Sequence, residues 1–145
     1  MGPSIAAVQL RSVTRGQPAI EVNETAAAGV TGLTVEAEPL QGAAMSCLYG
    51  ELDVRDSAIV HGVRPGINGY AIIAQLCALD LDGVELRVGP DRVSRGIWAD
   101  QSTLALHEVD LQGGQAGILS WSSALFLEDT RIHDMTDASS GVVAM

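Results

Sequence analysis

The sequence predicts an all-β fold, a right-handed parallel β-helix of about six short coils with three strands in each coil. Three observations support this prediction. A phrase that opens Leu-x-hydrophobic recurs at intervals of 27, 25 and 21 residues, starting at Leu52, Leu79, Leu104 and Leu125. Within each phrase the apolar residues alternate with period two, which is typical of a β-strand. No stretch combines the 3.6-residue apolar period with the capping residues of a helix.

Each repeat is expected to supply three strands. The first strand begins at the leucine, and a small or polar pair then turns the chain into the second strand. These pairs are Asp56-Ser57, Gly83-Val84, Glu108-Val109 and Asp129-Thr130. A loop of variable length follows, and the third strand begins at Ala71, Gly96, Gly117 and Gly141. A unit of this length cannot bury its apolar face alone, so we expect the repeats to stack into a solenoid.

Stacking pairs each strand in parallel with the equivalent strand of the next coil, about 4.8 Å away. Equivalent side chains then form columns that point into the core. The four leucines are expected to form one such column. Two further columns are expected from Ile72, Ile97, Ile118 and Val142, and from the small residues Ala74, Ala99, Ser120 and Ala144.

The N-terminal part follows the repeat less closely. We expect residues 33–35 to form a first strand and residues 44–46 a third strand. Residues 8–10 and 19–22 are expected to be the first and third strands of an earlier coil. Residues 1–145 are thus expected to be a single β-helix domain, either complete or a piece of a longer solenoid.

The net charge of the chain limits the classes of binding partner that we expect. The formal net charge is −10, and the chain contains no lysine, so all eight basic residues are arginine. General binding to nucleic acid needs basic patches, which makes a nucleic-acid partner unexpected. No apolar run approaches the roughly 18 residues of a membrane span, so no membrane span is expected.

The phrase Leu-x-Leu-x-x-Val-x-Leu, at residues 104–111, and Gly-Ile-x-Ala, at residues 96–99, resemble right-handed β-helix repeat proteins of the pectate-lyase-like superfamily. Residues 30–145 carry the resemblance, which is closest to uncharacterised repeat proteins of bacterial surfaces. It implies the fold and an extracellular or cell-surface location. The superfamily contains polysaccharide lyases and hydrolases beside non-catalytic adhesins, so the resemblance does not decide the function.

The residues that catalyse glycan cleavage in that superfamily are not evident. The chain has no Asp-Asp, no Gly-His-Gly and no lysine. Asp53, Asp80 and Asp82 are expected on the outward side of successive first strands, with Asp53 below Asp80. They are a weak candidate for a calcium site, and the alternative is an acidic face in contact with water. No other cofactor is expected.

A second candidate site lies where the longest loops leave the coils. The corner contains half or more of the arginines, and its functional interpretation is a pocket for an anionic ligand such as a uronate-bearing glycan. Its structural interpretation is a set of Arg–Asp pairs that tether the loops. The histidines near it are expected to be surface or loop residues. The residues of this loop corner are His61, Arg64, Arg87, Asp91, Arg92, Arg95 and His133.

The third strands supply the most distinctive feature. The residues expected to point outward on five successive coils are apolar, namely Met45, Ile73, Trp98, Leu119 and Val143. Trp121 belongs to the next outward column. An apolar outward column indicates a docking face, unless another part of this chain covers it or the register is off by one.

The same register also predicts how far apart the two cysteines lie. It places Cys47 outward and level with Gln75, so that its Cα would lie about 8 Å from that of Cys77. That separation is beyond the comfortable reach of a disulfide.

From these observations we expect a non-catalytic binding or structural module. Its apolar stripe would dock a protein partner, another subunit or a glycan. The alternative is a polysaccharide lyase or hydrolase that acts on an acidic glycan at the loop corner.

Overall fold

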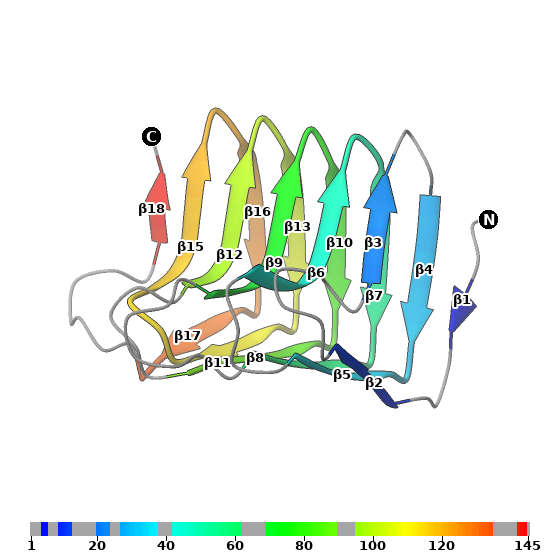
Figure 1. The fold of residues 1–145 in the computed structure, drawn as a ribbon. Coiled ribbons are helices and arrows are strands. Elements are labelled where there is room, and N and C mark those ends of the chain that lie inside the picture. The colour runs from blue at the N-terminus through cyan, green and yellow to red at the C-terminus, as the bar shows by residue number, and fades with distance from the viewer. Residues whose placement is uncertain are drawn as a thin grey trace.

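A computed structural model describes residues 4–5, 9–12, 20–23, 27–37, 42–61, 69–89, 95–134 and 142–144. All regular structure in these residues is β-strand, and the strands wind into a stack of coils (Figure 1). Three parallel sheets of six strands run along the stack, so that each coil contributes one strand to every sheet. The predicted parallel β-helix, with about six coils and three strands in each, is confirmed.

The coils visit the sheets in a fixed order. Sheet A holds β1 (Ser4–Ile5), β4 (Ala27–Thr31), β7 (Glu51–Arg55), β10 (Ala78–Asp82), β13 (Thr103–His107) and β16 (Ala124–Glu128). Sheet B holds β2 (Gln9–Ser12), β5 (Thr34–Ala37), β8 (Ala58–His61), β11 (Glu85–Val88), β14 (Asp110–Gln112) and β17 (Arg131–His133). Sheet C holds β3 (Ile20–Asn23), β6 (Gly42–Leu48), β9 (Gly69–Gln75), β12 (Arg95–Asp100), β15 (Ala116–Trp121) and β18 (Val142–Ala144).

Two-residue corners connect sheet A to sheet B, at the pairs that the sequence predicts. The first residue of each corner has a positive φ, which is 65° at Gly83 and 48° at both Asp56 and Asp129. Glycine adopts this conformation without steric cost, and aspartate tolerates it better than most residues. The backbone N–H of Asp56 donates to the carbonyl of Asp82 in the next coil, at 3.0 Å. The corners therefore continue the hydrogen-bonded ladder from one sheet into the next.

Serine side chains close the corners that lead from sheet C to sheet A. The Oγ of Ser102 accepts the backbone N–H of Cys77 at 3.1 Å and donates to the carbonyl of Asp100 at 2.9 Å. One coil later, the Oγ of Ser123 accepts the N–H of Ser102 and donates to the carbonyl of Trp121. Each hydroxyl thus satisfies a backbone donor where the sheet ladder is interrupted.

The core includes the predicted columns of leucine and isoleucine. Leu52, Leu79, Leu104 and Leu125 are successive Cα partners, and the first three are fully or almost fully buried. The isoleucine column also forms as predicted, from Ile72 to Val142. The structure extends that column to Met45 and Ile20.

The N-terminal strand assignments are partly wrong. Residues 34–37 form β5 in sheet B, so residues 33–35 do not form a first strand, which is instead β4. Residues 9–12 form β2, which also belongs to sheet B. The reason is that Gly32-Leu33 is a corner equivalent to Gly83-Val84, with Gly32 at a φ of 65° and Leu33 buried. The predicted third strand at residues 19–22 is confirmed by β3.

The predicted register of β6 is wrong by one residue. Met45 pairs with Ile72, and Cys47 pairs with Ala74 where Gln75 was expected. Residues 43–45 are all apolar, and so are residues 47 and 48, so alternation could not fix which set points inward. The correction brings Cys47 into the core, where it forms a disulfide with Cys77 at a Cα–Cα distance of 6.0 Å. The expected separation of about 8 Å was therefore also wrong.

Candidate functional site

The outward face of sheet C carries the apolar stripe over its C-terminal coils. Ile73, Trp98, Leu119 and Val143 are successive Cα partners on β9, β12, β15 and β18. On β9, β12 and β15 their neighbours along the strand are buried core residues such as Ile97 and Ala99, so alternation directs the stripe away from the core there, and Val143 continues the column by pairing with Leu119. The predicted column is present on four coils.

The prediction that Met45 belongs to this stripe is wrong. Met45 is fully buried in the isoleucine column, and the residue that pairs with Ile73 is Ser46. Glu21 pairs with Ser46 in the coil before that. The stripe therefore begins at Ile73, and it is preceded by two polar positions that mark its boundary.

Trp121 lies beside the stripe and contacts it. Leu48, Gln75, Asp100 and Trp121 pair successively in the next outward column. The ring centroids of Trp98 and Trp121 are 5.9 Å apart, and the two planes are inclined by 55°. This is the tilted arrangement that aromatic pairs favour.

Leu119 is the best-covered residue of the stripe, with only 9% of its surface exposed. Trp98 pairs with it from the coil before, Val143 pairs with it from the coil after, and Trp121 follows it two positions along β15. The stripe residues and Trp121 form an apolar cluster on the outside of the sheet. We call Ile73, Trp98, Leu119, Trp121 and Val143 the sheet C patch.

The loop corner is described only in part. Arg64, Asp91 and Arg92 lie outside the described residues. The side chain of Arg87 is 61% exposed on the outer face of β11, and its guanidinium lies 3.5 Å from the carboxylate of Glu85. Arg95 opens β12 and donates to the side chain of Gln115 at 3.3 Å. The anionic pocket and the acidic-glycan activity remain predictions.

The two histidines of the loop corner have different environments. His61 was expected to be a surface or loop residue, but it ends strand β8, is 2% exposed and pairs with Val88, so it points into the core. Burial lowers the pKa of His61, and its Nδ1 has no hydrogen-bond partner among the described atoms. His133 lies on the outer face of β17, where its ring nitrogens contact Asp110 at 2.6 Å and Asp134 at 2.8 Å.

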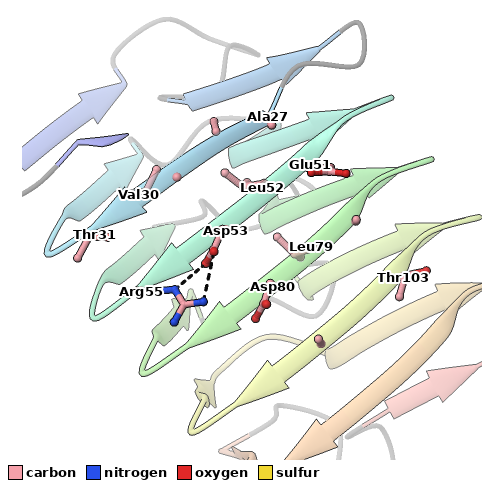
Figure 2. A pocket seen from close by; sticks show the side chains of 14 residues that line it. Ala27, Val30, Thr31, Glu51, Leu52, Asp53, Arg55, Leu79, Asp80 and Thr103 are labelled. Atoms are coloured by element: carbon pink, nitrogen blue, oxygen red, sulfur yellow. Dashed lines mark hydrogen bonds and ion pairs between the residues drawn. The ribbon is translucent and has the colours of Figure 1, made fainter. Parts of the chain in front are cut away.

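A shallow depression lies on the outer face of sheet A. Residues of β4, β7, β10 and β13 line it, with Ala27, Ala78 and Ala105 among the small ones. Figure 2 shows Asp53 and Asp80 on adjacent strands in this depression, with Arg55 hydrogen-bonded to Asp53. These bonds and the charge of Asp53 raise the pKa of Arg55 above its usual value. This depression was not evident from the sequence.

The acidic candidates for calcium have the predicted register. Asp53 and Asp80 are Cα partners, and Asp82 shares their face of the sheet. Arg55 contacts Asp53 at 3.1 Å and Asp82 at 3.6 Å. A guanidinium thus already accompanies two of the three carboxylates, and calcium binding at this set remains a prediction.

A mixed cluster surrounds His107 at the corner between sheets A and B. Asp82 pairs with His107 from the coil before, and Glu128 pairs with it from the coil after. The Nδ1 of His107 lies 3.1 Å from Asp82, and its Nε2 lies 4.0 Å from Asp129. The hydrogen bond to Asp82 raises the pKa of His107, and the nearby carboxylates add to the effect. His107 was not among the candidate residues from the sequence, although its pairing with Asp82 and Glu128 follows from the repeat.

No family model matches this chain, and comparison with curated proteins and with solved structures found no match. No helix among the described residues is long and apolar enough to cross a membrane. The structure thus shows a parallel β-solenoid of stacked coils, and the resemblance to the pectate-lyase-like superfamily remains a prediction.

Proposed function

We propose that this chain is a non-catalytic binding module that docks a protein partner through the sheet C patch. The observation that supports the proposal is the outward apolar column that continues over four coils and is joined by Trp121. A sheet face in contact with water is usually polar at such positions. A contiguous apolar face marks an interaction site more often than a chance cluster.

The shape of the patch favours a protein partner over a glycan. A sugar ring stacks on a flat aromatic surface, and two rings serve one glycan chain best when they are nearly coplanar. Trp98 and Trp121 are inclined by 55°, so their rings form a ridged surface and not a flat one. Aliphatic and aromatic side chains from a protein can fill such a ridged surface, and tryptophan is enriched at the centres of protein interfaces.

Charge favours a partner other than a second copy of the chain. Two copies with a net charge of −10 each repel one another at low ionic strength. Asp100 lies in the same column as Trp121, and Glu21 belongs to the polar boundary of the patch. A partner with a neutral or basic rim around an apolar centre would complement this face.

The two tryptophans provide the test, because they are the only ones in the chain and both belong to the patch. A photo-crosslinking amino acid at Gln75, beside the patch, would identify the partner in native extracts. The purified partner is then titrated against the module while tryptophan emission is recorded. We expect saturable binding with a shift of the emission to shorter wavelength, because docking removes water from both indoles.

Two substitutions distinguish docking at the sheet C patch from non-specific hydrophobic binding. Ile73→Asp places a charge in the patch and should weaken binding at least tenfold. Val60→Asp places the same charge on the outer face of sheet B, where Val60 is partly exposed, and should leave binding unchanged. Equal losses in the two variants, or binding that leaves tryptophan emission unaltered, would rule out docking at the sheet C patch. A concentration-dependent dimer in light scattering would show self-association instead.

A further inference from the structure

The corner cluster around His107 is built from one repeated position in four successive coils. Arg55, Asp82, His107 and Glu128 are consecutive Cα partners at the ends of β7, β10, β13 and β16. Asp129 is the positive-φ residue of the corner that follows β16. Parallel stacking therefore sets an imidazole between a carboxylate from the coil before and two carboxylates from the coil after.

The two ring nitrogens of His107 have different surroundings. Nδ1 is 3.1 Å from Oδ1 of Asp82, and the other oxygen of Asp82 is 3.6 Å from the guanidinium of Arg55. Nε2 faces Asp129, whose Oδ2 is 4.0 Å away. One ring nitrogen and one oxygen from each of Glu128 and Asp129 lie within 4.8 Å of one another.

This geometry matches a known arrangement in which a carboxylate orients a histidine side chain for metal binding. Metal-binding histidines usually donate their other ring N–H to a carboxylate, which fixes the tautomer and the orientation of the ring. Asp82 is placed to accept that N–H from Nδ1, which leaves the lone pair of Nε2, 4.0 Å from Oδ2 of Asp129, to bind an ion. We propose that His107, Glu128 and Asp129 form a binding site for a divalent transition-metal ion, with Asp82 as the residue that positions His107.

The ligand set defines the class of ion. One imidazole with two carboxylates suits Zn²⁺, Co²⁺, Ni²⁺ or Mn²⁺, whereas calcium prefers a shell made of oxygens. Zn–N and Zn–O bonds are about 2.0–2.2 Å, so the ligand atoms of a tetrahedral site lie about 3.4 Å apart, and atoms up to 4.8 Å apart must close in by as much as about 1.4 Å. The side chain of Asp129 is 72% exposed and that of His107 is 42% exposed, so both have room to move.

The opposite side of the imidazole is a poorer site. Asp82, His107 and Glu108 also bring one ligand atom each within 4.8 Å of one another. A metal ion there would share Asp82 with the guanidinium of Arg55, and the two positive charges would repel each other. Arg55 therefore favours the Nε2 side.

The test uses untagged protein and zinc chloride. Isothermal titration calorimetry should show one saturable event, and ¹⁵N spectra of the imidazoles should show that Zn²⁺ shifts Nε2 of His107. Asp82→Asn should weaken zinc binding by about 10- to 100-fold, since it removes the group that orients the ligand. His107→Gln should abolish the event. Asp129→Asn should also weaken zinc binding. Because asparagine tolerates a positive φ as aspartate does, this loss cannot be attributed to a change in the corner backbone.

His133 provides the matched control. It also contacts two carboxylates, Asp110 and Asp134, but they lie at opposite nitrogens of the ring and no third ligand joins them in the described residues. His133→Gln should therefore leave the calorimetric event unchanged. Undiminished zinc binding in His107→Gln, an equal loss in His133→Gln, or no saturable event in the wild type would each overturn the proposed site. Melting curves without metal should confirm that all variants are folded.

Discussion

Removing the disulfide between Cys47 and Cys77 is expected to lower the stability of the β-helix substantially. The bond closes a loop between residues that are 30 apart in sequence. In the chain-entropy treatment a loop of this length stabilises the fold by about 3.6 kcal/mol at 25 °C, because the crosslink restricts the unfolded chain. For a domain of this size the loss corresponds to a decrease in melting temperature of about 10 °C.

The structure indicates a replacement that introduces little else. Cys47 occupies the column that Ala74 and Ala99 continue, so Cys47→Ala places in it the residue type that the next two coils use. Cys77 occupies the corner position that Ser102 fills one coil later. Cys77→Ser therefore supplies a hydroxyl where the fold already accommodates one. The double variant should isolate the effect of the crosslink from that of packing.

The assay is thermal and urea denaturation followed by circular dichroism, with and without a reducing agent. Reduction should lower the melting temperature of the wild type to that of the double variant, and it should have no effect on the double variant. Both cysteines are buried, so reduction of the folded protein should be slow and should speed up under partly denaturing conditions. If the oxidised wild type and the double variant melt within about 2 °C of each other, the loop-entropy reasoning is refuted.

Three further substitutions test the core, the buried histidine and the tightest turn. Leu104→Ala removes a fully buried leucine between two others, so it should lower the free energy of unfolding measured in urea by about 3–5 kcal/mol. A decrease below about 1 kcal/mol would contradict the stacked core. His61 has a pKa lowered by burial, so stability should be full above a pH of about 6.5 and should fall on acidification, because the unfolded chain takes up the proton first. His61→Val, which copies Val88 in the same column, should reduce the difference in unfolding free energy between pH 7.5 and pH 5.5, and an unchanged difference would exclude His61 as its source. Gly113→Ala should prevent native folding or lower the melting temperature sharply. A Cβ at this position would lie 2.1 Å from the carbonyl oxygen of Val88, and the φ of residue 113 is 89°. A variant with native stability would show that the turn can be rebuilt.

The sequence was sufficient to predict the coils wherever the repeat is regular. From Leu52 to Leu125 the strand starts, the corners and the inward columns all follow from period-two alternation interrupted by small or polar pairs. Gly83 and Asp56 are informative because few residue types accept a positive φ. The same rule would have identified Gly32-Leu33 as a corner and so corrected the N-terminal strands.

Two parts of the candidate sites could not be derived from alternation. The register of β6 was ambiguous because both faces of that strand are apolar or small, and only the structure shows that Met45 points inward and Ser46 outward. The surroundings of His107 depend on side-chain rotamers, which the repeat does not specify. What the repeat does specify is that Asp82, His107 and Glu128 occupy one column, and that relation was available from the sequence.

The disulfide also determines how the molecule would respond to tension. Cys47 lies in β6 and Cys77 follows β9, so the covalent loop encloses one entire coil, from β7 to β9. Each coil contacts only its neighbours, so the coils outside the loop can peel away one at a time when the chain is pulled from its two ends. The enclosed coil can lose its structure but cannot lengthen the chain. About 100 Å of contour, the reach of some 30 extended residues, would be released only in a reducing environment.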